Sequence, residues 1–257
     1  MILAADNLHA LHPVVADALR RLDPAPLQQL AQRCQQPGVK YLDLNPGYLS
    51  RRNEDRLAFM VETIQEVSDL RLILDNPSPR VIAKGLAVCR DRAVINALSL
   101  EPDKIEAMLP LAVQHGAQLI LLLMDERSRV PARLEEKLAV AVQLRELALD
   151  AGLHPEDLIF DPVLPNLSWP DAFAQIAEVV KTVRLLAGWS IFEQPATTMV
   201  GLSNLRSGLS DRYPQAVAQS CLHLLAGAGL NLVLASALEP EVLSSVHMIN
   251  QMTETIY

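Results

Sequence analysis

The chain has 257 residues, of which 50% are hydrophobic and 4% are aromatic, and α/β barrels of this length commonly form one domain that needs no disulfide or structural metal. Its formal net charge is −8, with charges of both signs mixed along the chain. This balance argues against a nucleic-acid-binding protein, because such proteins usually carry a basic stripe.

Eight short apolar runs bounded by Gly, Pro, Asn or Asp predict strands that are buried on both faces of a parallel sheet. In chain order these runs are Ile2–Ala5, Val39–Asn45, Leu70–Asp75, Ala93–Asn96, Gln118–Met124, Asp157–Asp161, Thr198–Ser203 and Asn231–Ala235. Amphipathic patterns between them predict helices, most clearly at Arg56–Val67, Ile105–Val113 and Leu134–Ala148.

Eight strand-helix units in a chain of this length predict a (β/α)8 TIM barrel that forms a single domain over residues 1–257. An open, doubly wound sheet is the alternative, although it usually has fewer units or a second domain. The first predicted strand is not followed by G-x-G-x-x-G, which argues further against a dinucleotide-binding fold of that kind.

Cysteine spacing and hydropathy indicate a cytoplasmic protein. Cys34, Cys89 and Cys221 lie far apart, without a C-x-x-C pair, which argues against a zinc site or a disulfide framework and is typical of a reducing compartment. The longest apolar run, Leu119–Met124, is far shorter than the ~20 residues that cross a bilayer. The N-terminal sequence also lacks the pattern of a signal peptide, so we expect no membrane association.

The active site of such a barrel forms at the carboxyl ends of its strands, and polar residues stand at most of these ends. They are Asp43 and Asn45, Asp75, Asn96, Asp125, Asp161, and Ser203 with Asn204. Such residues often cap the next helix instead. However, most of these loops hold a second cap candidate further on, at Ser78, Ser99, Ser168 and Ser210. We therefore expect the strand-end residues to bind a ligand.

The chemistry of this ring favours a flat heterocycle. The ring contains no Lys, no strong nucleophile and no histidine in the position of a base. Its aspartates lack a neighbouring second carboxylate or histidine, so we expect no metal site. A carboxylate can accept two parallel N–H bonds from an amidine-like edge, and an amide can both donate and accept.

Six segments in chain order resemble those of the pterin-binding methyltransferases. They are LDLNPG (42–47), LILDNPSPRVIAKGL (72–86), RAVINALS (92–99), LPLAVQHGAQLILLLM (109–124), EDLIFDPVLP (156–165) and VGLSNLRSGL (200–209), and the ending INQMTETIY (249–257) is also similar. The resemblance is strongest to methyltetrahydrofolate:corrinoid/iron–sulfur protein methyltransferases. The folate-binding domain of cobalamin-dependent methionine synthase is similar, and dihydropteroate synthase is a more distant relative.

The resemblance implies a homodimeric TIM barrel that binds 5-methyltetrahydrofolate and passes its methyl group to the cobalt(I) of a corrinoid carried by another protein. Asp75, Asn96 and Asp161 would hold the pterin ring, with Asp161 on its 2-amino and N3 edge. Gly201 and Ser203 would line the same pocket. Asn204 would be the catalytic residue, hydrogen-bonded at N5.

Several positions depart from the family pattern at the rim where the corrinoid would approach. Asp6-Asn7-Leu8-His9 replaces an acidic-Arg-hydrophobic-Asn segment, Asp125 stands where Asn is usual, and Ser236 stands where aspartates are usual. These departures keep open the alternative of a non-catalytic or regulatory pterin-binding protein. A dihydropteroate synthase is a second alternative, but it would need a Lys near strand seven and an Arg-x-His after strand eight, which this chain lacks.

Overall fold

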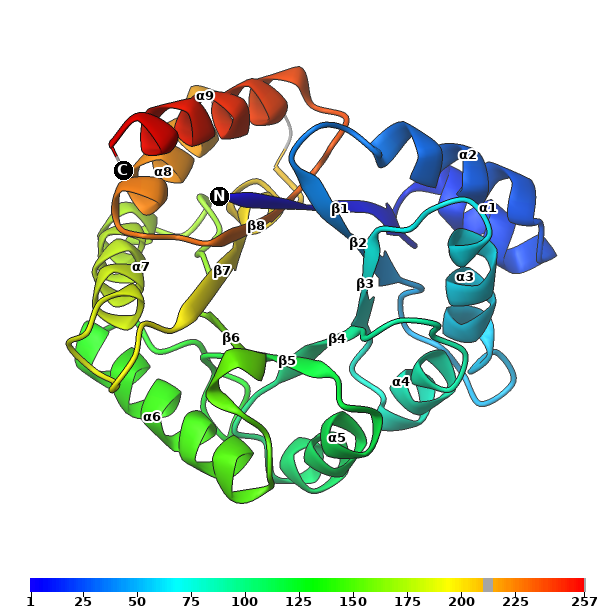
Figure 1. The fold of residues 1–257 in the computed structure, drawn as a ribbon, viewed down its shortest axis with the longest axis horizontal. Helices are drawn as coiled ribbons and strands as arrows, with labels where there is room; N and C mark the ends of the chain where they lie inside the picture. The colour runs from blue at the N-terminus through cyan, green and yellow to red at the C-terminus, as the bar shows by residue number, and fades with distance from the viewer. Residues whose placement is uncertain (210–214, 257) are drawn as a thin grey trace.

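Eight parallel strands close into a barrel, and helices cover its outer surface (Figure 1). The computed structural model describes residues 1–209 and 215–256. The strands in these ranges are β1 (Ile2–His9), β2 (Val39–Asn45), β3 (Arg71–Asp75), β4 (Val94–Leu98), β5 (Gln118–Leu122), β6 (Leu158–Asp161), β7 (Thr197–Gly201) and β8 (Leu232–Ala235). Because β8 pairs with β1, the sheet is closed. The predicted (β/α)8 barrel is confirmed and the open sheet is excluded.

Two α-helices follow β1, and one follows each later strand. They are α1 (Pro13–Arg21), α2 (Pro24–Cys34), α3 (Arg56–Gln65), α4 (Pro79–Leu86), α5 (Pro102–His115), α6 (Leu134–Asp150), α7 (Ala172–Ala187), α8 (Gln215–Gly227) and α9 (Pro240–Ile256). Two short 3-10 helices, η1 (Pro155–Asp157) and η2 (Leu202–Leu205), precede β6 and follow β7. Among the described helices, none is long and apolar enough to span a bilayer.

Strand β1 is longer than predicted and carries the chain into the mouth of the barrel. Its pairing with β2 continues to His9 opposite Asn45, after a register shift between Ala5 and Leu8. This irregularity contains Asp6 and Asn7. Polar residues there interrupt the apolar run, which is why the sequence pattern ends at Ala5 although the strand does not.

Three other strand ends also differ from the prediction. β4 continues two residues past Asn96, which therefore lies inside a strand. β5 ends at Leu122 rather than Met124. β7 ends at Gly201, so Ser203 and Asn204 lie in η2, where the chain turns sharply.

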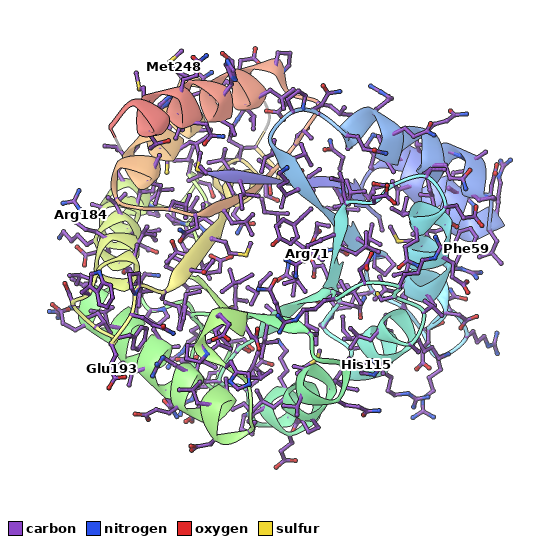
Figure 2. All side chains as sticks on the ribbon, in the orientation of Figure 1. Phe59, Arg71, His115, Arg184, Glu193 and Met248 are labelled. Atoms are coloured by element: carbon purple, nitrogen blue, oxygen red, sulfur yellow. The ribbon has the colours of Figure 1, made fainter. Side chains whose placement is uncertain are left out.

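The barrel interior is filled by one layer of buried side chains and is closed at its amino end. The layer takes one residue from each strand: Ala4, Tyr41, Ile73, Val94, Ile120, Ile159, Met199 and Leu232. At the start of β3, the Arg71 guanidinium lies 5.2 Å from the centre of the Tyr41 ring and donates to Gln118 Oε1 at 2.7 Å. Figure 2 shows Arg71 within the ring of strands, whereas Phe59 and His115 lie on the outer helices.

Candidate functional site

A ring of polar side chains lies at the carboxyl end of the barrel, directly beyond the apolar layer. Side chains alternate between the two faces of a strand, so the residue two positions after each member of that layer also faces inward. In chain order these residues are Asp6, Asp43, Asp75, Asn96, Leu122, Asp161, Gly201 and Leu234. Four carboxyl groups and one amide therefore converge on one mouth.

Asp75 and Asn96 lie side by side on β3 and β4, as paired residues of the sheet. Asn45 Nδ2 donates to Asp75 Oδ2 at 2.7 Å, and Gly47 N donates to Asn45 Oδ1 at 2.9 Å. This chain of bonds fixes one oxygen of Asp75 and holds the turn after β2 against it. Burial raises the pKa of Asp75 to about 6, and the bond from Asn45 opposes this rise.

Asp43 is the most deeply buried carboxyl group of the ring, with 2% of its surface exposed. Burial raises its pKa well above the ordinary value, repulsion from Asp75 and Asp6 adds to the rise, and a bond from Asn96 opposes it. Its Oδ1 has no hydrogen-bond partner among the described residues. Asp43 therefore keeps its proton to a higher pH than an ordinary aspartate, within the same mouth as Asp75.

Asp161 ends β6 on the opposite side of the mouth and is 5% exposed. Val163 N donates to its Oδ1 at 2.8 Å. Burial raises the pKa of Asp161 to about 6, while this bond and the charge of Lys137 both act to lower it. In the described part of the chain, no hydrogen bond reaches Oδ2, so that oxygen is available to a ligand.

Gly201 and Asn204 are in close contact at the end of β7. A Cβ atom on Gly201 would lie 3.2 Å from Asn204 Nδ2 and 3.5 Å from Asn204 Cγ. A side chain at position 201 would therefore displace the Asn204 amide. Next to Asn204, the Ser203 side chain acts on the carboxylate of Asp6 and lowers its pKa, and both residues line one cavity between η2 and β1.

Asn166, in the loop after β6, holds the loop after β7 in place. Its Nδ2 donates to the backbone oxygens of Asn204 at 3.2 Å and Ser207 at 2.9 Å. Leu167 N also donates to Leu205 O at 2.9 Å. The Asn204 backbone is therefore anchored from the same loop that begins at Asp161, although the sequence pattern gave no reason to select Asn166.

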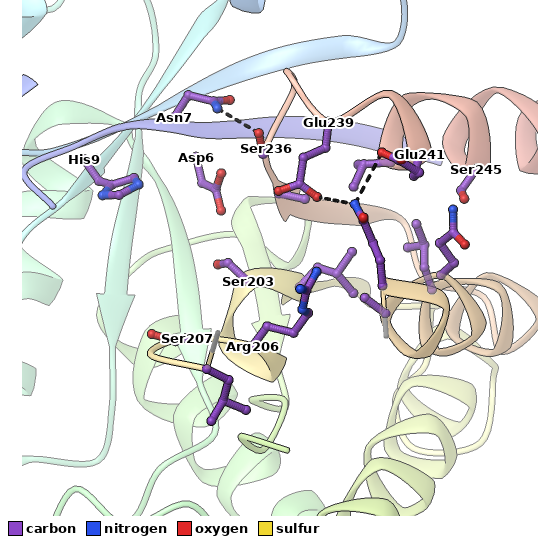
Figure 3. A pocket seen from close by; sticks show the side chains of 18 of the residues that line it. Asp6, Asn7, His9, Ser203, Arg206, Ser207, Ser236, Glu239, Glu241 and Ser245 are labelled. Carbon is purple, nitrogen blue, oxygen red and sulfur yellow. Dashed lines mark hydrogen bonds between the residues drawn. The ribbon is translucent and has the colours of Figure 1, made fainter. Parts of the chain in front are cut away.

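A cavity of about 460 Å³ opens beside η2, between β1, β8, α8 and α9 (Figure 3). Asp6 and Ser203 belong to its lining, whereas Asp75, Asn96, Asp161, Gly201 and Asn204 do not. Carboxylates of Glu239 and Glu241 face it, and Arg206 is the one Lys or Arg among the described residues that line it. Burial raises the pKa of Asp6 to about 6, the Ser203 side chain opposes this rise, and the charge of Glu239 adds to it.

Two of the departures from the family pattern contact each other. Asn7 Nδ2 donates to Ser236 Oγ at 2.9 Å, and Ala237 N donates to Asn7 Oδ1 at 2.8 Å. These bonds join the ends of β1 and β8, as Figure 3 shows for Asn7 and Ser236. A third departure, Asp125, accepts from Arg129 Nε at 2.8 Å, and this bond lowers its pKa to about 2. Its carboxylate is thus engaged by its own turn.

The expectation about helix caps is partly wrong. The cap positions before α5 and α7 are Glu101 and Asp171, rather than Ser99 and Ser168. Ser78 does precede α4, but its side chain makes no capping bond. Ser210 lies outside the described residues. The strand-end residues are nonetheless free of this role, because none of them occupies a cap position of these helices.

Lys137 is a further residue near the site, and it lies on a helix behind the ring of strand-end residues. It lies on α6, is 1% exposed, and donates from Nζ to Pro162 O at 2.7 Å. Helical spacing could have revealed it, because Lys137 is three residues after Leu134 and four before the buried Ala141, on the apolar face of α6. In the described part of the chain, no group of three or more His, Cys, Asp or Glu side chains is arranged to hold a metal ion.

Comparisons with known proteins agree with this geometry. Residues 15–234 match the model of the pterin binding enzyme family. A methylcorrinoid:tetrahydrofolate methyltransferase from Eubacterium limosum is 25% identical over 214 residues, which are 82% of this chain and 77% of that protein. A methionine synthase from Mycobacterium leprae is 23% identical over 206 residues, which are 78% of this chain but only 17% of the methionine synthase. A dihydropteroate synthase structure from Yersinia pestis shares the fold, with a TM-score of 0.71 and 17% identity over 99% of this chain and 94% of that one.

Proposed function

Because the chain belongs to the pterin-binding enzyme family, we propose that it is a methyltransferase acting between 5-methyltetrahydrofolate and the cobalt(I) of a corrinoid protein. The observation that carries the proposal is the mouth itself, where β6 ends at Asp161, Asp75 and Asn96 are paired on β3 and β4, and the Asn204 amide lies against Gly201. The similarity to a methylcorrinoid:tetrahydrofolate methyltransferase supports the reaction type. Either direction of transfer is compatible with this site.

In this proposal the pterin ring lies across the mouth. The Asp161 carboxylate accepts two N–H bonds from the 2-amino and N3 edge, which a carboxylate recognises in the same bidentate manner as a guanidinium. Asp75 and Asn96 bind the other polar atoms of the ring. Gly201 and Ser203 line the pocket, and the absence of a side chain on Gly201 leaves room for the Asn204 amide.

Asn204 is the proposed catalytic residue at N5. During transfer, an electron pair of cobalt(I) forms the Co–C bond. The C–N5 bond breaks at the same time, and N5 keeps the electron pair of the broken bond and gains a proton. An amide can accept from a protonated N5 and donate to an unprotonated one, so it follows N5 through the displacement. Carboxyl groups that can exchange a proton lie at the same mouth, because burial raises the pKa of Asp6 to about 6 and that of Asp43 well above its ordinary value.

The proposal also covers the partners of the protein. Its methyl acceptor or donor is a corrinoid, such as cobalamin, held by a separate protein that docks at the carboxyl end of the barrel. We propose a cytoplasmic homodimer that binds neither nucleic acid nor membrane. A net charge of −8 is unfavourable for binding nucleic acid.

Dihydropteroate synthase is the competing activity, because solved structures of that enzyme share the fold. That reaction would require cations for a diphosphate. Arg206 is the one cation among the described lining residues of the cavity, and it is accompanied by Asp6, Glu239 and Glu241. This acidic surface is unfavourable for a diphosphate, so we favour methyl transfer.

An anaerobic assay with 5-methyltetrahydrofolate and free cob(I)alamin tests the proposal. We expect cobalt(I) absorbance to fall and methylcobalamin to form, and Asn204→Ala to slow both strongly. His115→Ala, on the exposed end of α5, is the matched control and should keep full activity. If nothing turns over, tight folate binding that Asp161→Asn abolishes would indicate a non-catalytic or regulatory pterin protein. Turnover of a pterin diphosphate with p-aminobenzoate would instead establish the synthase.

A further inference from the structure

Lys137 is buried to a degree that is rare for a lysine. It is 1% exposed, whereas Glu135 and Glu136 on the same turn of α6 are exposed. The one hydrogen bond of its ammonium group to the described residues is the bond from Nζ to Pro162 O, at 2.7 Å. A buried ammonium group is costly without a compensating charge, so its neighbours must explain why it is there.

Burial lowers the pKa of Lys137 to about 8, and the charges of two carboxylates oppose this shift. One is Asp161 at the end of β6, and the other is Glu178 on α7. Glu178 is already engaged, because it accepts from Lys181 Nζ at 2.7 Å and from Leu134 N at 3.0 Å, and Arg133 also acts on it. For Asp161, Lys137 is the one cation that acts on the carboxyl group among the described residues.

Lys137 also holds the backbone turn that carries Asp161. Its bond ends on Pro162, between Asp161 and Val163. Val163 has φ +59°, a left-handed conformation that is unfavourable for a β-branched residue and persists only where the surroundings fix it. In that conformation Val163 N points at Asp161 Oδ1, 2.8 Å away. The same turn therefore aims the carboxylate and is anchored from below by Lys137.

We propose that Lys137 is a positioning residue for Asp161: it anchors the Asp161–Val163 turn and supplies the counter-charge that keeps this carboxylate ionised under a bound pterin. The inference rests on the proposed function, since the pterin is the ligand that removes Asp161 from water. Covering a carboxylate with a neutral ring disfavours its charged form. Without a nearby cation, Asp161 would take up a proton and lose one of its two acceptor sites.

The test measures binding of 5-methyltetrahydrofolate between pH 5.5 and 8.5 in the wild type, Lys137→Met and Lys137→Arg. Burial raises the pKa of Asp161 to about 6, so wild-type binding should weaken below about that pH. In Lys137→Met the same loss should begin about one pH unit higher, which makes binding about threefold weaker at pH 6.5, about eightfold weaker at pH 5.5 and nearly normal at pH 8.5. Lys137→Arg, which keeps the charge, should resemble the wild type.

Comparing each variant with the wild type at the same pH removes the titration of the folate itself. If Lys137→Met weakened folate binding by the same factor at every pH, or did not change it, the proposal would be overturned. A lysine with a merely structural role would affect binding independently of pH. A titration of the Asp161 carboxyl carbon by carbon-13 NMR, without any ligand, separates this result from failure of the proposed function. Its pKa should rise in Lys137→Met even if the wild type binds no folate, and an unchanged pKa would refute the role of Lys137.

Discussion

Replacing Asp161 with Asn should make the protein more stable relative to the wild type as pH rises, although it also removes a charge that offsets the buried Lys137 ammonium. Burial raises the pKa of Asp161 from 3.8 to about 6, so between these values the folded protein holds a proton that the unfolded chain has lost. The free energy of unfolding of the wild type therefore falls as pH rises through this window. The shift corresponds to about 3 kcal/mol. An asparagine carries no such cost, and its oxygen can still accept from Val163 N.

Urea unfolding of both proteins at pH 4, 5, 6 and 7.5 measures the effect. The difference in free energy of unfolding, variant minus wild type, should rise by about 2.5 kcal/mol from pH 4 to pH 7.5. Asp125→Asn is the matched control. The pKa of Asp125 is lowered to about 2 by Arg129, so this carboxylate stays ionised from pH 4 to pH 7.5. The difference in free energy of unfolding between Asp125→Asn and the wild type should therefore not change with pH. A flat profile for Asp161→Asn would refute the burial argument.

Three further changes probe other parts of the mouth. Gly201→Ala should lower kcat more than KM with little change in Tm, because its Cβ would lie 3.2 Å from Asn204 Nδ2 and displace the amide. Asn166→Ala, which removes the bonds to the loop after β7, should lower kcat and raise the protease sensitivity of that loop; unchanged values of both would contradict its anchoring role. Asp43→Asn should raise Tm at pH 7.5, because it removes a carboxyl group whose ionisation is opposed first by burial and then by repulsion from Asp75; a lower Tm would show that this penalty is outweighed.

The barrel was predictable because its strands are buried on both faces. Each strand is a short apolar run followed by an amphipathic helix, and eight such units in this length allow few other folds. The mouth was predictable for the same reason, since a polar residue at the end of an apolar strand faces the carboxyl end of the barrel. Asp75 and Asp161 occupy such positions. Their contact with a pterin remains a prediction.

Other parts of the site depend on contacts between distant segments. Asp6 and Asn7 belong to β1 because its pairing with β2 resumes after an irregularity, and no local pattern announces this. Asn166 holds the loop after β7 by donating to the backbone oxygens of Asn204 and Ser207, which are 38 and 41 residues later in the chain. Lys137 was overlooked because a lysine among glutamates suggests a solvated helix face, although the helical spacing places it on the buried one.

The most direct test of the proposed function follows the methyl group itself. The protein is incubated anaerobically with 5-methyltetrahydrofolate that carries carbon-13 in the N5 methyl group, together with cob(I)alamin, and the carbon-13 NMR spectrum is recorded. If the protein catalyses the proposed transfer, the label moves to the methyl group bound to cobalt with its three hydrogens retained, and Asn204→Ala greatly slows the transfer. Label that remains on N5 in the presence of the wild-type protein, with a native corrinoid protein also supplied, would contradict the proposed function.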